Sequence, residues 1–482
     1  MSTENKHHVF YVAIKWSESG QLERCRFGRD FERLKANFSR EPASDGKNVE
    51  SENTRKAQEI PETSLANVMN RIVDTINAQS ELIPSARIMG SVMYMAQAET
   101  HLAKPIENRS ELIENVNGVK IYGLDEETFL QLAPAFERVS RFRRGVSALP
   151  AALLMSIVAT FDSSVADIVR AMLTLKSNTF QVGEKTIPLG EVLQASPIDE
   201  IKAKILDDEI YQFSRGSHED QVKYIEKVFH INIIEHWKRW PDFVEVFERR
   251  NLIAHGEKSF TERYVAICKK HNHKGSEKVL GARIELSFDY LKQANEILLE
   301  FAILLVFSLW RKHFAEQKDE AFSAVNQTAF ELIRSHEYTV PIRVLEYVLS
   351  LKNVEAAEST RRMMVVNLAS AYAHSGNNDK CAQILDGVDW SASSDNYKIC
   401  VAALKSNLKE VCRLMPLVEA AGSVTKSDIR EWPVFDFVRD KPEVIQKFEE
   451  VYKEPMVVRE AAKSDDIHNE DTMRPHSKST LH

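Results

Sequence analysis

The chain has 482 residues, enough for two to four domains with buried cores, and its 43% hydrophobic and 28% charged residues are typical of an ordinary globular protein. Its net charge of −8 provides no overall attraction to nucleic acid, so any such binding must depend on a local basic site. Five cysteines without an even framework in a short segment argue against a disulfide-stabilised scaffold and favour a reducing cytosol.

The start of the chain, MSTENKHH, lacks the charged and then apolar segments of a signal peptide. The longest apolar runs, residues 149–161 and 301–310, are shorter than the roughly 20 residues that span a bilayer. We therefore expect a cytoplasmic protein with no membrane partner.

The first part of the chain mixes strand and helix patterns. Residues 9–16 run apolar like a strand, and residues 25–38 indicate a second strand that passes into a helix. Residues 39–53 are rich in Ser, Glu, Asp, Asn and Gly, which predicts a linker.

Helical spacing continues over residues 65–83, where Pro84 is expected to end the helix. A further helix is expected over residues 87–102 and a short strand over residues 119–123. We assign no chemistry to residues 1–134 and expect a small α+β region that senses a signal or covers the rest of the chain.

From residue 138 onward the pattern is nearly all helical. Arg143 and Arg144 belong to a basic cluster before an apolar helix that begins near residue 149. Such a cluster is usually a solvated helix end, but here it is also a candidate phosphate contact. Residues 288–310 are long and mainly apolar, which predicts a buried central helix.

One stretch concentrates chemistry: residues 240–256, WPDFVEVFERRNLIAHG. Pro241 suits a first helical turn and Gly256 a left-handed cap, so a short helix with sharp ends is expected. At about 100° per residue, Arg250 falls near the middle of an apolar arc. The arc is formed by Phe243, Val246, Phe247, Ile253 and Ala254.

A charged arginine side chain in an apolar arc requires either a pairing partner inside the protein or a functional role. Asn251 and His255, four residues apart, share the neighbouring face with Glu248. In the structural interpretation, Arg250 and Glu248 simply form a buried pair. In the functional interpretation, Arg250, Asn251 and His255 form one site.

These residues carry a resemblance. The sequence RRNLIAHG, followed by ERYV at residues 262–265, resembles the HEPN superfamily of ribonucleases, in which an Arg, a polar residue and a later His end a helix of an all-α bundle. The resemblance covers residues 138–313 and is strongest from 217 to 265. It implies a homodimer in which two copies of the motif form one composite RNA-cleaving site.

RNA carries its own nucleophile, the 2′-hydroxyl, so a protein can cleave it without a metal by moving protons and stabilising charge on the phosphate. His255 suits general acid or base catalysis, and Arg250 suits bidentate contact with the phosphate. Asn251 is expected to orient either group or the dimer, and Arg249 to support substrate binding. The resemblance implies 2′,3′-cyclic phosphate and 5′-hydroxyl products, and use as a toxin or antiviral effector.

Cys268, His271 and His273 lie close together but lack the paired spacing of a zinc site. We therefore expect no metal and no cofactor. A solvent loop, or basic groups near RNA, explains these residues better.

After residue 317 the pattern changes to helix pairs. Large and small residues around Asn367, Tyr372, Gly376 and Leu385 resemble a tetratricopeptide unit. Such a short α-solenoid either binds a protein partner or packs on a neighbouring domain.

The predicted fold is therefore mainly α. It comprises an N-terminal α+β region (1–134), a HEPN-like helical bundle (135–316), a tetratricopeptide-like segment (317–455) and a disordered tail (456–482). Two other functions stay open at this point: a dimerising scaffold without catalysis, and a nucleotide-binding module of the same superfamily.

Overall fold

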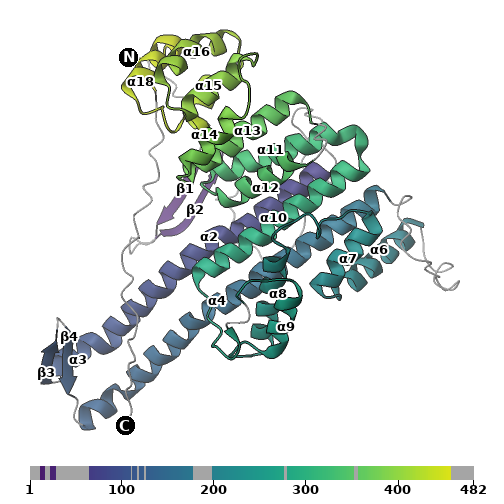
Figure 1. Ribbon diagram of the computed structural model, residues 1–482. Helices are drawn as coiled ribbons and strands as arrows, with labels where there is room; N and C mark the ends of the chain where they lie inside the picture. The colour runs from purple at the N-terminus through teal and green to yellow at the C-terminus, as the bar shows by residue number, and fades with distance from the viewer. Residues whose placement is uncertain are drawn as a thin grey trace. The chain divides into compact units, whose positions relative to one another are not determined.

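The computed structural model describes residues 11–16, 22–28, 64–109, 111–116, 119–123, 126–176, 198–275, 279–351 and 356–456. The chain divides into two units, Met1–Glu59 and Ile60–His482. Most of the described residues are helical, so the prediction of a mainly α fold is confirmed (Figure 1). The predicted linker at residues 39–53 and the predicted tail beyond Met456 lie outside the described residues.

The described part of the first unit is an antiparallel pair of strands, β1 (Tyr11–Trp16) and β2 (Leu22–Gly28). Their register shifts between Lys15 and Trp16. The first predicted strand is confirmed within residues 11–16, and the second begins three residues earlier than predicted. The helix predicted to follow it lies outside the described residues.

The second unit begins with one long helix, α2 (Leu65–Ala98), where two helices were predicted. Ser64 caps its start, because its side chain accepts from the backbone N–H of Asn67. The expectation that Pro84 ends a helix was wrong, since Pro84 lies inside α2. Burial on both sides of Pro84 offsets the backbone hydrogen bond that proline cannot donate: Ile76 and Ile83 are buried before it, and Gly90 after it.

A π-helical turn (Glu99–Ala103) and the short helix α3 (Lys104–Arg109) lead from α2 to an antiparallel hairpin. The hairpin is formed by β3 (Glu111–Val116) and β4 (Val119–Gly123), so the strand expected at residues 119–123 is confirmed.

The centre of the second unit is formed by α2, α4 (Glu126–Leu175) and α10 (Phe288–His313), which pack against each other in pairs (Figure 1). The prediction that the helix at residues 288–310 is buried is confirmed, because every residue from Ala294 to Phe307 is buried. The boundary placed at residues 134/135 falls inside α4. Residues 65–98 were assigned from sequence to the N-terminal region, but they belong to the bundle, because α2 packs on both α4 and α10.

Four shorter helices pack on this centre and position the site: α6 (Ile198–Ser214), α7 (His218–Phe229), α8 (Trp240–Ala254) and α9 (Glu262–Lys270). α8 packs on both α4 and α10, and α9 packs on α8. An aromatic cluster fixes α8: Phe243 lies 5.7 Å from Phe161 of α4 and 4.6 Å from Phe301 of α10, between ring centroids.

The described part of the chain then continues in helix pairs, which are followed by two further helices and a 3₁₀ turn between them. These are α11 (Lys318–Arg334) with α12 (Thr339–Ser350), α13 (Glu358–His374) with α14 (Asn378–Asp386), α15 (Asp395–Leu404) with α16 (Leu408–Ala420), then α17 (Lys426–Glu431), the 3₁₀ turn η4 (Pro433–Phe435) and α18 (Pro442–Tyr452). Gly376, at the α13–α14 turn, has a φ of +79°, which favours glycine.

Two helices, α4 and α10, are long and apolar enough to cross a membrane by length and composition. The uninterrupted apolar runs within them, residues 149–161 and 301–310, are shorter than a bilayer span, whereas the whole helices are long enough. The most apolar window of α10 is 89% buried inside the bundle, which accounts for its composition without a membrane. The corresponding window of α4 is 44% buried.

Candidate functional site at the end of α8

α8 begins and ends where the sequence predicts. Pro241 occupies its first turn, and Gly256 follows it with a φ of +75°. The N–H of Gly256 donates to the carbonyl of Ile253, and the N–H of Glu257 donates to the carbonyl of Leu252. This pair of bonds is a Schellman cap, which satisfies the last carbonyls of the helix and fixes the position of His255.

A cavity of about 560 Å³ lies beside the C-terminal half of α8. α4, α7, α8 and α9 all contribute to its walls. The charged and histidine side chains among its lining residues are Asp162, Arg215, His218, Glu219, Glu248, Arg250, Arg263 and Lys270. Four of these are cations and three are carboxylates, so the lining has a small excess of positive charge in a chain whose net charge is negative.

Arg250 lines this cavity, and not all of its guanidinium donors form hydrogen bonds. Its guanidinium donates to Asn251 Oδ1 at 3.1 Å and, over a longer 3.4 Å, to Asp162 Oδ2. Its Nε is buried and has no hydrogen-bond partner among the described residues. The structural alternative, a pair between Arg250 and Glu248, does not form within the described residues, because Arg250 turns to Asp162 instead.

His218, the first residue of α7, enters the same cavity. Its Nε2 lies 2.8 Å from Asp162 Oδ1, and its ring stacks on Phe247 with centroids 3.5 Å apart. Asp162 therefore contacts His218 through one oxygen and Arg250 through the other. An imidazole held on two sides in this way is positioned for proton transfer.

His255 lines a second cavity of about 380 Å³. Glu248, Asn251 and Arg263 line both cavities and form the wall between them. The structure thus brings Asn251 together with Arg250 in the larger cavity and with His255 in the smaller one. Arg250 lines only the larger of these adjoining cavities, and His255 lines only the smaller one.

Glu248, in this wall, accepts from Asn251 Nδ2 at 3.5 Å. Burial raises the pKa of Glu248 above its ordinary value, although Arg263 and the hydrogen bond from Asn251 oppose this effect. A carboxyl group with a raised pKa beside a histidine and two arginines is typical of sites that handle protons or phosphate.

Glu219 holds the cations at the far side of the larger cavity. It accepts from Lys223 at 2.6 Å and from Lys270 at 3.0 Å, and lies 3.1 Å from His271 Nε2. Burial alone would raise the pKa of Glu219, but the hydrogen bonds from Lys223 and Lys270 lower this pKa to about 2. Glu219 is therefore ionised at neutral pH and neutralises part of this edge.

Arg249, expected to support substrate binding, lines neither cavity. Its guanidinium contacts Glu245 Oε1 at 2.6 Å and lies over the ring of Tyr290, 3.9 Å from its centroid. Tyr264 and Tyr290 also donate to Glu245, at 2.6 and 3.0 Å. Glu245 is only 3% exposed, so Arg249 serves to balance a buried carboxylate rather than to reach a ligand.

Arg143 and Arg144 are exposed on α4 and line neither cavity. They precede Asp162 by 18 or more residues of one continuous helix, which places them about 27 Å from it along the helix axis. The structure does not bring them to the site within one protomer.

The side chains of Cys268, His271 and His273 do not converge on one point. Cys268 is fully buried, and burial raises the pKa of its thiol to about 12. His271 Nδ1 accepts from Trp240 Nε1 at 3.1 Å, and its Nε2 contacts Glu219. Within the described residues, no group of three or more His, Cys, Asp or Glu side chains is arranged to hold a metal ion.

Sequence reasoning missed Asp162, His218 and Arg263. His218 follows Ser217, whose side chain caps α7 by accepting from the N–H of Asp220 at 3.2 Å. A serine at a helix start is a local signal for the helix, but it gives no role to the histidine beside it. No signal in the sequence links Asp162 to His218, because they are 56 residues apart and meet only through packing of α7 on the bundle.

Comparison with known proteins found no matching family model, no similar curated protein and no similar solved structure.

Proposed function

We propose that the chain is a metal-independent endoribonuclease of the HEPN type, with its site at the C-terminal end of α8. One observation carries the proposal: Arg250 and His255, the two ends of the motif, line adjoining cavities whose common wall contains Asn251, Glu248 and Arg263. A phosphate bound at this wall would have cations on one side and an imidazole on the other.

The proposed reaction needs no metal. The 2′-oxygen of RNA attacks the adjacent phosphorus while a base takes the proton of the 2′-hydroxyl. The bond from phosphorus to the 5′-oxygen breaks as an acid protonates that oxygen, which leaves a 2′,3′-cyclic phosphate and a 5′-hydroxyl. Imidazole groups can fill both roles near neutral pH.

In this proposal His255 provides one imidazole, and His218, held by Asp162, provides the other. Arg250 binds the phosphate and stabilises the charge that develops on it, because a guanidinium forms paired hydrogen bonds to two phosphate oxygens. Asn251 positions Arg250 through the 3.1 Å bond between them. The protein acts as a homodimer, so that two motifs share one RNA.

An enzyme that cleaves cellular RNA would damage its own cell if it were always active, so we propose that its activity is regulated. A regulated cytoplasmic toxin or antiviral effector fits a nuclease followed by helix pairs. These pairs would form a tetratricopeptide-like α-solenoid that binds a regulatory protein or packs internally.

The test is cleavage of total cellular RNA in EDTA by the full-length protein and by His255→Ala, with oligomeric mass measured by light scattering. His236→Ala is the matched control, because His236 is exposed and lines neither cavity. We expect cleavage by the wild type and the control, none by His255→Ala, and one mass for all three. Unchanged cleavage by His255→Ala would refute the assignment. If the wild type does not cleave RNA and the oligomeric mass of His255→Ala differs from that of the wild type, the scaffold function is favoured.

A further inference from the structure

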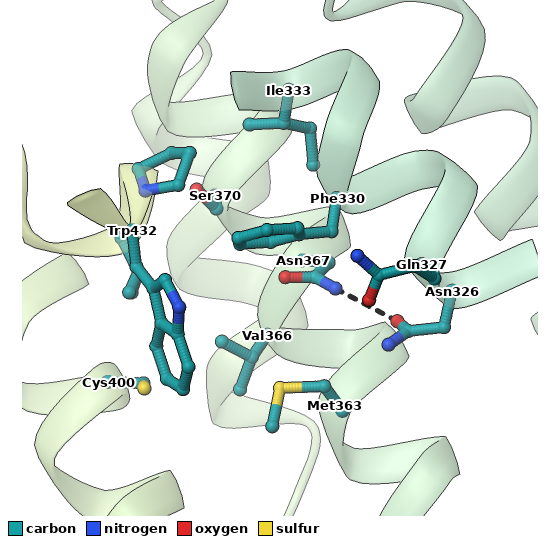
Figure 2. A pocket seen from close by; sticks show the side chains of 12 residues that line it. Asn326, Gln327, Phe330, Ile333, Met363, Val366, Asn367, Ser370, Cys400 and Trp432 are labelled. Atoms are coloured by element: carbon teal, nitrogen blue, oxygen red, sulfur yellow. Dashed lines mark hydrogen bonds between the residues drawn. The ribbon is translucent and has the colours of Figure 1, made fainter. Parts of the chain in front are cut away.

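A separate cavity of about 370 Å³ lies among the C-terminal helices, between α11, α13 and the start of η4 (Figure 2). Its twelve lining residues are Asn326, Gln327, Phe330 and Ile333 of α11, Met363, Val366, Asn367 and Ser370 of α13, Cys400 of α15, and Trp432, Pro433 and Val434. A cavity of this size suits a small molecule.

None of these lining residues is charged at neutral pH. Burial raises the pKa of the Cys400 thiol to about 12, so it too is neutral. A free anion or cation placed here would lose its hydration without a counter-charge. The group that enters the cavity is therefore uncharged.

Two carboxamides set the polar side of the cavity. Asn367 Nδ2 donates to Asn326 Oδ1 at 2.9 Å, which fixes both groups. This bond leaves Asn367 Oδ1 as a hydrogen-bond acceptor, and in Figure 2 that oxygen points away from Asn326, toward the side of Trp432. Asn367 is only 7% exposed, so its free oxygen favours a ligand that donates.

Ser370, one helical turn further along α13, gives an independent indication. Its side chain is only 2% exposed, and its Oγ has no hydrogen-bond partner among the described residues. A buried hydroxyl that forms no hydrogen bond destabilises the protein, because it has lost its bonds to water without replacement. A ligand that accepts or donates at this position would remove that destabilisation.

Two aromatic rings complete the cavity. Phe330 and Trp432 lie 6.3 Å apart between ring centroids, with an angle of 80° between their planes. In this edge-on arrangement Phe330 does not stack on the indole, and in Figure 2 the indole lies across from Asn367 and Val366. A flat ring can stack on the face of the indole and direct its edge toward the polar groups.

We propose that this cavity binds a nucleobase with an exocyclic amino group, presented as an uncharged nucleoside. The base stacks on Trp432, its amino group donates to Asn367 Oδ1, and the neighbouring ring nitrogen accepts from the Ser370 hydroxyl. Adenine and cytosine offer this pair of groups on one edge, whereas hypoxanthine and uracil carry a carbonyl in place of the amino group. The proposal is independent of the ribonuclease proposal and does not involve residues of the α8 site.

The test is isothermal titration calorimetry of the full-length protein with adenosine, cytidine, inosine and uridine. We expect saturable binding of adenosine or cytidine, and binding of the matching carbonyl nucleoside at least about tenfold weaker, because its carbonyl would face the oxygen of Asn367. Ser370→Ala should weaken binding by about three- to tenfold without lowering Tm, since the hydroxyl has no partner in the free protein. Ser375→Ala, at an exposed serine that follows the same helix, should bind as the wild type does.

Absence of saturable heat with all four nucleosides up to about 10 mM, which corresponds to a free energy weaker than about 3 kcal/mol, would overturn the proposal. Equal affinity for adenosine and inosine, and for cytidine and uridine, would also overturn it. Wild-type affinity in both Ser370→Ala and Asn367→Leu would place the ligand elsewhere and reject this cavity. If Asn367→Leu fails to fold, Ser370→Ala alone decides.

Discussion

The imidazole of His218 lies flat on the ring of Phe247, with 3.5 Å between the ring centroids and 16° between the planes, while its Nε2 lies 2.8 Å from Asp162. Phe247 is only 2% exposed and belongs to the bundle core, so the core itself fixes one face of the histidine. This contact couples the packing of α8 to the geometry of the cavity that contains Arg250.

The first prediction concerns this histidine. His218→Gln should reduce RNA cleavage about 100-fold or more, because it removes one of the two proposed proton-transfer groups, while preserving a side chain that can contact Asp162. The measurement is the rate of cleavage in EDTA, with circular dichroism to check the fold. His236→Gln, at an exposed histidine outside the cavities, should cleave at the wild-type rate. A His218→Gln protein of full activity would remove His218 from the mechanism.

Adjacent arginines of α8 should behave in opposite ways. Arg249→Met leaves the buried Glu245 without its cation and should lower the free energy of unfolding by about 3–5 kcal/mol. Arg250→Met should lower it by less than about 1 kcal/mol, because its contact with Asp162 is long and part-exposed. Cleavage should nevertheless be lost in Arg250→Met.

Urea denaturation measures both free energies of unfolding. Adding Glu245→Gln to Arg249→Met should restore part of the stability, because the buried charge is then gone. Equal effects of the two single variants on stability would show that Arg250 too serves mainly to hold the fold.

A third prediction concerns pH. The pKa of Glu219 falls from 4.5 in the unfolded chain to about 2 in the folded protein, through its lysine and histidine partners. A lowered pKa means that its contribution to stability is complete above about pH 4.5 and is lost as the pH falls toward 2. The contribution is about 1–2 kcal/mol, because solvent screens part of the interaction.

Glu219→Gln should therefore be less stable than the wild type at pH 6 to 7, and the difference should shrink between about pH 4.5 and 3. Chemical denaturation of both proteins across this range measures it. Glu257→Gln, at an exposed glutamate after α8, is the control and should show little difference at any pH. A stability difference between wild type and Glu219→Gln that does not change with pH would contradict the prediction.

A fourth prediction concerns the proline inside α2. Pro84 is exposed and donates no backbone hydrogen bond, so Pro84→Ala should raise the free energy of unfolding by about 1–3 kcal/mol. Thermal unfolding measures the change, with Ser85→Ala at the adjacent exposed position as control. A loss of stability in Pro84→Ala would mean that the helix depends on a bend at this position.

Local chemistry explains why some elements could be predicted. Pro241 and Gly256 set the ends of α8 through backbone preferences that act within a few residues. The apolar content of α10 likewise reflects burial on all sides. Pro84 failed as a helix end because the burial of α2 against its neighbours, which no local rule includes, outweighs one missing hydrogen bond.

The same distinction applies to the site. The sequence by itself determined where α8 begins and ends, and that Arg250, Asn251 and His255 lie at its C-terminal end, because helix caps and helical spacing are local properties. Only the tertiary structure decided that Asp162 and His218 join Arg250, that Arg249 turns to Glu245, and that Arg143 and Arg144 stay remote. Those outcomes depend on how helices far apart in the chain pack together, and packing is decided by the shape and burial of whole helix faces, which no short motif records.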